Sequence, residues 1–380
     1  MRASFAGLAR MRRVSTADNE QVGRMVDALY HMPGPNLAAA VVSYETPSPG
    51  LEPVAPTVIA YGARTLCGVA ELDANHIVGN YRITAKLGAG GMGSVYRVEH
   101  VSLGRAYALK VLNGHLRSQT RDSAAQFLNE ARAAARVRHP HVVDIFDFGY
   151  LPDGRSYFVM ELLGTPSVAG LLEGRTPEIA QAVAIALQLA QALAAVHDQG
   201  VVHGDVSSSN VLVEPGTSEA GIPHVKLVDF GLARVVGPGV RPPQIADIVY
   251  GTPAYIAPEV ARGHAAEVCS DQYSFGVLLY ELLAGAAPFI EKDIRALCRA
   301  HIYDPLPAVR SPHGRVPDQI AAIVERCCAK SPAVRFPDMH HVATALADAI
   351  RALSRKQRRR WFGASVGTID GAVAGRSVRR

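Results

Sequence analysis

The sequence predicts an α+β protein with two lobes, a small β-rich lobe followed by a larger helical lobe. Two features predict this order. Between about residues 80 and 163, short β-branched and aromatic segments alternate with glycine turns, which is typical of strands. After about residue 165, the segments lengthen and apolar residues recur at helical spacing. The hydrophobic share of 48% is enough to fill a substantial core.

The small lobe is predicted from strand-like segments and one helix. YRITAKLG, SVYRVEH and RAYALKVL read as strands, and the alanine-rich residues 123–137 read as the helix. HPHVVDIFDFG and SYFVMELL then return to strand. The larger lobe is predicted from helices at residues 177–198, 271–284, 292–302, 317–329 and 338–351. The folded domain is therefore expected over residues 80–350, with lobes at about 80–163 and 164–350.

The two ends of the chain lack this periodicity. Frequent prolines in residues 1–76 predict a loosely structured lead-in rather than a domain. Residues 351–380 are predicted to be a basic tail, because six Lys and Arg residues fall within its first ten positions. Such a run is usually a solvated helix end, with weak contact to nucleic acid or to a membrane surface as the alternative. The net charge of +5 is mild, and no nucleic-acid partner is expected.

Cysteine usage and apolar runs bear on location. The five cysteines are scattered without a C-x-x-C pair, which fits reduced thiols and a cytoplasmic location. The N-terminus is basic but has no continuous apolar stretch, so it is a poor signal peptide. The longest apolar run, Ile179 to Val196, is interrupted by three glutamines. We therefore expect a buried core helix there and no transmembrane segment.

A glycine-rich stretch, LGAGGMGSV at residues 87–95, is the first indication of chemistry. Gly88, Gly90 and Gly93 form G-x-G-x-x-G, which in a dinucleotide-binding fold follows a strand and opens a helix. Here SVYRVEH follows, which predicts a second strand and therefore a hairpin. A hairpin without bulky side chains can close over a polyphosphate and offer backbone N–H groups to it. The alternative is an ordinary glycine-rich hairpin.

Charged and amide side chains follow in an order that suits phosphate chemistry. Lys110 ends the third strand, where its ammonium can reach phosphates, and Glu130 on the next helix could hold it. A surface salt bridge is the structural alternative for that pair. Asp229, in Asp-Phe-Gly, follows the strand VKLV, which suits a hard cation such as Mg²⁺. In VVHGDVSSSNVL, Asp205 lies five positions before Asn210, a spacing that could position a nucleophile and a metal ion.

Together these motifs resemble those of protein kinases of the eukaryotic type, and LGAGGMGSVY is similar to the bacterial serine/threonine members. The resemblance covers about residues 80–350 and extends to GTP at 251–253 and APE at 257–259. It implies the bilobal protein-kinase-like fold, with ATP and Mg²⁺ as cofactors. It also implies transfer of the ATP γ-phosphoryl group to serine or threonine hydroxyls of protein substrates.

The resemblance implies a role for each acceptor-side residue. Asp205 would accept the proton of the substrate hydroxyl. Thr252 would contact Asp205 and favour serine or threonine over tyrosine acceptors. Glu259 would pair with Arg335, and Asp271 would hold the backbone of the catalytic loop.

The resemblance likewise implies the nucleotide and metal residues. Lys110, held by Glu130, would contact the α- and β-phosphates, while Asn210 and Asp229 would hold Mg²⁺. Val95, Ala108 and Leu212 would sandwich the adenine, and the backbone of Glu161 and Leu163 would hydrogen-bond its edge. The residues around ATP would be Leu87, Gly88, Ala89, Gly90, Gly91, Met92, Gly93, Ser94, Val95, Ala108, Lys110, Met160, Glu161, Leu163 and Leu212.

Two positions of the catalytic loop depart from the family pattern. Gly204 stands where relatives carry an arginine, which typically pairs with a phosphate on the activation segment. Ser207 stands where serine/threonine members carry a lysine near the γ-phosphoryl group, a charge worth on the order of 10²–10³ in kcat. The activation segment would lie between Gly231 and Gly251, and residues 232–250 contain no serine or threonine. Gly204 and the absence of serine and threonine from residues 232–250 predict an active enzyme that needs no phosphorylation of the activation segment. The missing lysine predicts either a slow kinase or another cation that compensates.

Two other classes of function are alternatives. The first is a nucleotide-binding pseudokinase scaffold with weak or no transfer activity, which only the missing lysine favours. The second is a dinucleotide-dependent oxidoreductase, which requires a helix directly after Gly93. The segment SVYRVEH argues against such a helix.

Overall fold

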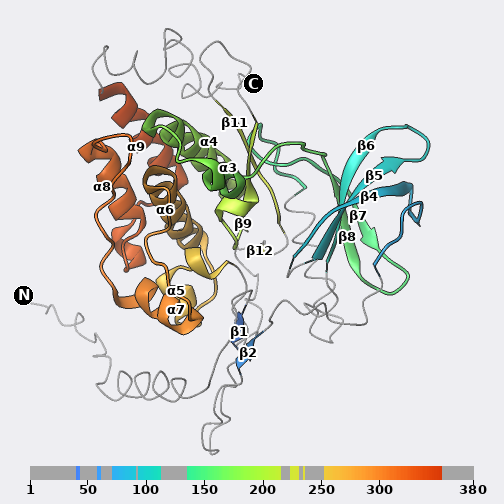
Figure 1. The fold of residues 1–380 in the computed structure, drawn as a ribbon, viewed down its shortest axis with the longest axis horizontal. Coiled ribbons are helices and arrows are strands. Elements are labelled where there is room, and N and C mark those ends of the chain that lie inside the picture. Colours follow the sequence, from blue (N-terminus) through green and yellow to red (C-terminus); the bar gives the residue numbers. More distant parts are fainter. Residues whose placement is uncertain are drawn as a thin grey trace, which may run out of the picture.

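The structure is a computed structural model of the chain. It describes residues 40–42, 58–60, 71–90, 93–112, 135–214, 223–230, 234–235 and 252–352. Within the predicted lead-in, β1 (Ala40–Val42) and β2 (Val58–Ala60) pair as a two-stranded antiparallel sheet. The other described residues form two lobes, one of β-strands and one dominated by helices (Figure 1).

The small lobe is an antiparallel sheet of six strands in the order β3-β4-β5-β6-β8-β7 (Figure 1). Its strands are β3 (Ile77–Val78), β4 (Tyr81–Gly90), β5 (Gly93–His100), β6 (Ala106–Leu112), β7 (Ile145–Tyr150) and β8 (Ser156–Met160). Large side chains such as Ile83, Tyr96 and Leu109 fill its core. The glycine-rich stretch lies in the β4–β5 hairpin, as predicted. A strand begins at Gly93, so the helix that an oxidoreductase would need is absent there.

The predicted helix over residues 123–137 lies mostly outside the described residues. Its described end, residues 135–137, is a turn and not helix. The chain turns there because Val137 packs into the core of the larger lobe with Val142 and Val143. The strand predicted at HPHVVDIFDFG also begins later, at Ile145. The residues before it bond to the larger lobe instead, since the N–H of Val143 donates to Leu227 O at 2.9 Å.

The larger lobe is built around two central helices, α4 (Ile179–Asp198) and α6 (Val268–Ala284), with further helices packed against them (Figure 1). Its helices are α3 (Val168–Gly174), α4 (Ile179–Asp198), α5 (Pro258–Ala261), α6 (Val268–Ala284), α7 (Ile294–Tyr303), α8 (Asp318–Cys327) and α9 (Met339–Ala352). α9 packs beside α4 and α8 beside α6. α6 begins three residues earlier than predicted because the Glu267 and Ser270 side chains form a reciprocal capping box at its start.

α4 is the apolar helix that the sequence places in the core. It is long and apolar enough to cross a membrane by length and composition, and the described residues contain one such helix. However, 78% of that apolar window is buried inside the lobe. A helix that is apolar on all sides is expected where every face meets protein, and α4 meets α6, α9 and β11.

Four short strands frame the catalytic loop between the lobes. β9 (Val201–Val202) precedes the loop and pairs with β12 (Arg234–Val235). β10 (Val211–Glu214) follows the loop and pairs with β11 (His224–Leu227). Residues 203–210 are therefore held at both ends by antiparallel pairing.

Candidate active site

The catalytic loop places Asp205 between Asn210 and Thr252. Asn210 Nδ2 donates to the backbone oxygen of Asp205 at 2.9 Å and to its Oδ2 at 2.8 Å. Thr252 donates to Asp205 Oδ1 twice, from its backbone N–H at 2.8 Å and from Oγ1 at 2.9 Å. The contact expected between Thr252 and Asp205 is thus present. Because both carboxylate oxygens accept hydrogen bonds, the orientation of this side chain is fixed from two sides.

Asp271, in the first turn of α6, holds the backbone at the start of this loop. Its Oδ2 accepts from the N–H of His203 and its Oδ1 from the N–H of Gly204, both at 2.8 Å. Burial alone would raise the pKa of Asp271, but hydrogen bonds from His197 and the Gly204 N–H, together with the charges of His197 and His203, outweigh it and lower that pKa. An ionised carboxylate accepts stronger hydrogen bonds than a neutral one. The loop backbone is therefore held firmly, with Gly204 at φ +77°.

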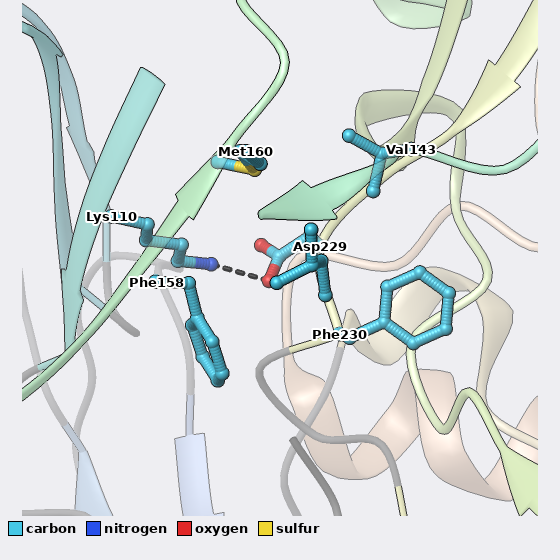
Figure 2. Close-up of a pocket in the computed structure, with 7 residues that line it drawn as sticks. Lys110, Val143, Phe158, Met160, Asp229 and Phe230 are labelled. Carbon is cyan, nitrogen blue, oxygen red and sulfur yellow. Dashed lines mark ion pairs between the residues drawn. The ribbon is translucent and has the colours of Figure 1, made fainter. Parts of the chain in front are cut away.

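Lys110 reaches from β6 across the junction of the lobes to Asp229 (Figure 2). Lys110 Nζ forms an ion pair with Asp229 Oδ1, and the two side chains are 8% and 20% exposed. Asp229 has a φ of +68°, a conformation that residues with a Cβ rarely adopt and that concentrates at functional sites. Glu130, which was expected to hold Lys110, lies outside the described residues.

A small pocket opens beside this ion pair (Figure 2). Its lining is apolar apart from the pair itself and consists of Lys110, Val143, Ile145, Phe158, Met160, Asp229 and Phe230. The Phe230 ring packs edge-on against His203 of the catalytic loop, with 5.0 Å between ring centroids. The segment that carries Asp229 is therefore packed directly against the loop that carries Asp205.

The residues expected to sandwich adenine come from both lobes. Val95 on β5 is half-buried, and Ala108 on the adjacent strand β6 is 6% exposed. Ala108 also lies opposite Met160 in the β6–β8 pairing. Leu212, on β10 of the larger lobe, is half-buried. Of the glycine-rich residues, Gly91 and Met92 lie outside the described residues, while Leu87 is 51% exposed in the hairpin.

The connection after β8 is tied to the larger lobe by contacts that sequence reasoning missed. The N–H of Glu161 donates to Asp144 O at 3.0 Å, and the Glu161 carboxylate accepts from the N–H of Asp144 at 2.9 Å. Lys226 Nζ on β11 donates to the same carboxylate at 2.7 Å. Glu161, whose backbone is expected to meet the adenine edge, is therefore anchored to Asp144 and Lys226.

Three consecutive serines fill the loop between Asp205 and Asn210. Ser207 is fully buried, and its Oγ lies 2.9 Å from Ser209 Oγ. Ser208 turns the other way, with its Oγ 2.7 Å from the hydroxyl of Tyr255. The position of the family's lysine is thus occupied by a neutral side chain that bonds within the loop.

An ion pair between Glu259 and Arg335 secures the segment that follows Thr252. Arg335 Nη1 donates to Glu259 Oε1 at 2.7 Å, and Nη2 donates to Oε2 at 2.8 Å. The guanidinium also donates to Cys269 O at 2.7 Å and to Ala329 O at 2.9 Å. The Arg335 side chain is completely buried. This is the pairing that the resemblance implied.

The two lobes and the charged site at their junction have the arrangement that the resemblance implied, and comparison with known proteins identifies the family. The protein kinase domain model matches residues 81–346, and the chain belongs to the protein kinase family. The protein-kinase-like fold predicted from the sequence is thus confirmed. Among solved structures, the PknI kinase domain of Mycobacterium tuberculosis aligns with a TM-score of 0.54 at 24% identity. That alignment covers 73% of this chain and 100% of the PknI chain, and it shows the shared fold.

Bacterial serine/threonine-protein kinases are among the relatives. The chain is 34% identical over 284 residues to serine/threonine-protein kinase pkn3 of Myxococcus xanthus, covering 73% of this chain and 51% of pkn3. It is 36% identical over 286 residues to PknJ of Mycobacterium tuberculosis, covering 74% of this chain and 47% of PknJ. The chain thus spans about half the length of these curated relatives.

Proposed function

We propose that this chain is a serine/threonine protein kinase that transfers the γ-phosphoryl group of ATP to hydroxyls of protein substrates. One observation carries the proposal: the Asp205 carboxylate is oriented by Asn210 and Thr252. The Lys110–Asp229 ion pair lies at the same junction of the lobes. The serine/threonine-protein kinases among the relatives support the class of acceptor.

Asp205 is the general base in this proposal. Asp205 is 6% exposed, and hydrogen bonds to both of its carboxylate oxygens restrict rotation of the side chain. A base held in this way accepts a proton from a hydroxyl that approaches along one direction, which removes much of the entropic cost of alignment. Thr252 belongs to the segment that would contact the acceptor, and its two hydrogen bonds to Asp205 couple the orientation of the Asp205 side chain to the position of that segment.

The nucleotide would be held by residues of both lobes. Lys110 would turn its ammonium from Asp229 toward the α- and β-phosphates. Asn210 and Asp229 offer oxygen ligands of the kind that Mg²⁺ prefers. Asn210 fits this role because its amide nitrogen faces Asp205, so its amide oxygen is directed away from Asp205. Mg²⁺, when bound, would neutralise charge on the phosphates.

Asp205→Ala tests the assignment. Loss of a general base lowers turnover by about 10²–10⁴-fold, while ATP binding should stay near normal because Asp205 acts on the acceptor. Transfer of radiolabelled phosphate to a generic protein substrate measures turnover, and calorimetric titration measures ATP binding. Wild-type turnover in Asp205→Ala would show that the loop is wrongly assigned. A wild-type protein that binds ATP without transfer would favour the pseudokinase scaffold.

We also propose that transfer needs no phosphorylation of the activation segment. Position 204 carries no cation to pair with a phosphate, and the N–H of Gly204 is held by Asp271 instead. Residues 232–250, most of them outside the described residues, contain no serine or threonine. A phosphate switch would need an arginine at position 204 and a serine or threonine within residues 232–250, and this sequence has neither.

Phosphatase treatment tests this second proposal. Treated and untreated protein should phosphorylate a generic substrate at the same initial rate. Mass spectrometry of both samples should show that treatment removed every phosphate present. A lag that disappears after preincubation with Mg²⁺ and ATP, with the new phosphate mapped to residues 232–252, would contradict the proposal.

A further inference from the structure

The catalytic loop contains a hydrogen-bonded link that the roles above leave unexplained. Ser208 Oγ lies 2.7 Å from the hydroxyl of Tyr255, and that hydroxyl donates to Glu281 Oε2 on α6. Ser208 and Tyr255 are each 6% exposed. Burying such groups is unfavourable unless each has a partner, so the link is stable only while its three members stay together.

The link joins two pieces of chain that both meet at Asp205. Ser208 lies three residues after Asp205, and Tyr255 lies three residues after Thr252. Tyr255 is also tied to its surroundings by its backbone, because its N–H donates to Thr252 O at 3.0 Å. On the other side, Ser274 Oγ on α6 donates to Tyr255 O at 2.7 Å. Movement of Tyr255 would therefore be transmitted to Thr252 and to its two hydrogen bonds with Asp205.

We propose that Ser208 is a positioning residue for phosphoryl transfer. Its hydroxyl, through Tyr255 and Glu281, holds the acceptor-side segment at residues 252–255 in place against Asp205. The inference rests on the proposed function, since it concerns the orientation of the base in that reaction. This link forms from unmodified side chains. The contact between an arginine and a phosphate that relatives use in this loop would form only after phosphorylation.

The neighbouring serines do not take part in this link. Ser207 Oγ and Ser209 Oγ lie 2.9 Å apart and bond to each other within the loop. Ser208 is thus the member of the triplet whose hydroxyl reaches the acceptor side. This difference allows the role of Ser208 to be tested by single substitutions.

Ser208→Ala is the first variant. Loss of one buried hydrogen bond should lower kcat/KM for a protein substrate by about tenfold, while KM for ATP stays unchanged. Ser208→Thr keeps the hydroxyl and should restore the wild-type values. Ser311→Ala is the control, because it removes the same hydroxyl outside the catalytic loop and the acceptor-side segment, where Ser311 Oγ accepts from the N–H of His313 at 3.3 Å. The control should leave both kinetic constants unchanged.

Tyr255→Phe removes the partner of Ser208 and completes a double-mutant cycle. It should lower kcat/KM at least as much as Ser208→Ala, because it also removes the bond to Glu281, and the double variant should lose no more than Tyr255→Phe alone. Additive losses would overturn the proposal, as would an equal rise in KM for ATP. If Ser208→Ala fails to fold, wild-type kinetics in Tyr255→Phe would overturn it instead.

Hydrogen exchange without nucleotide separates this inference from the proposed function. Peptides covering residues 252–257 should exchange faster in Ser208→Ala and at the wild-type rate in Ser208→Thr. Unchanged exchange in Ser208→Ala would overturn the positioning role even in an active enzyme. A wild-type protein that transfers no phosphate would refute the proposed function, whatever the exchange rates.

Discussion

Removing the Arg335 guanidinium should strongly destabilise the larger lobe. Its completely buried side chain donates to both oxygens of Glu259 and to the carbonyls of Cys269 and Ala329. Arg335→Met keeps an apolar side chain of similar length but leaves a carboxylate that is only 15% exposed without its partner. Breaking a buried ion pair by removing one member costs about 3–5 kcal/mol.

Thermal unfolding measures this loss. For a domain of this size, each kcal/mol shifts the melting temperature by about 2–4 °C, so a drop of roughly 6–20 °C is expected at neutral pH. Arg335→Lys keeps the charge but not the planar fork that meets both carboxylate oxygens, so its loss should be intermediate. Arg315→Met is the control, because the Arg315–Asp318 pair is 82% and 83% exposed and should contribute little.

The loss should also depend on pH. Burial alone would raise the pKa of Glu259, but the hydrogen bonds and charge of Arg335 outweigh it and lower that pKa below its ordinary value of 4.5. A lowered folded pKa contributes stability above the unfolded pKa, and this contribution is lost as the pH falls toward the folded pKa. In Arg335→Met the pKa of Glu259 should rise. Acidification then protonates Glu259, removes its unpaired charge and reduces the destabilisation of the variant.

The gap in melting temperature between wild type and Arg335→Met should therefore narrow from neutral pH to about pH 4. A gap that stays constant over this range would refute the account of Glu259. A drop no larger than that of Arg315→Met would refute the claim that the buried pair is costly to break.

Two further substitutions probe the site and the core. Thr252→Val removes one of the two donors to Asp205 Oδ1 and should lower kcat by roughly 10–100-fold in the transfer assay. Thr252→Ser keeps the donor, so an equal loss in both variants would contradict this reasoning. Gly276→Ala places a Cβ 2.7 Å from Cys327 Cβ where α6 meets α8, which should cost about 1–3 kcal/mol in thermal unfolding. Gly170→Ala is its control, since an added Cβ there meets nothing nearer than 3.7 Å, and equal melting of the two would refute the packing argument.

The sequence was informative where residue type and spacing together specify a partner. The order of strands and helices followed from periodicity, and the Glu259–Arg335 contact followed from a family motif. Helix boundaries were less predictable because caps determine them. α6 begins at Val268 because the Glu267 and Ser270 side chains satisfy backbone groups there, which the apolar pattern does not reveal.

Contacts between distant segments were not predictable from the sequence. Lys226 and Glu161 are 65 positions apart, and Ser208 and Tyr255 are 47 apart. These polar pairs form because packing of the larger lobe brings their strands and loops together, and no local periodicity records such an encounter. Two-residue strands such as β9 were missed for a different reason, because they are too short to show alternation.

Gly204 has a consequence for how much active enzyme a cell would contain. Its φ of +77° lies where a residue with a Cβ costs about 1–2 kcal/mol, so an arginine there would be strained unless a partner offset the strain. With glycine the working backbone needs no such partner. If phosphorylation is not required, as proposed, this modification does not limit the share of folded molecules that are active, and the amount of folded protein limits activity. A destabilising substitution far from the site would then lower cellular activity by lowering the abundance of the folded protein.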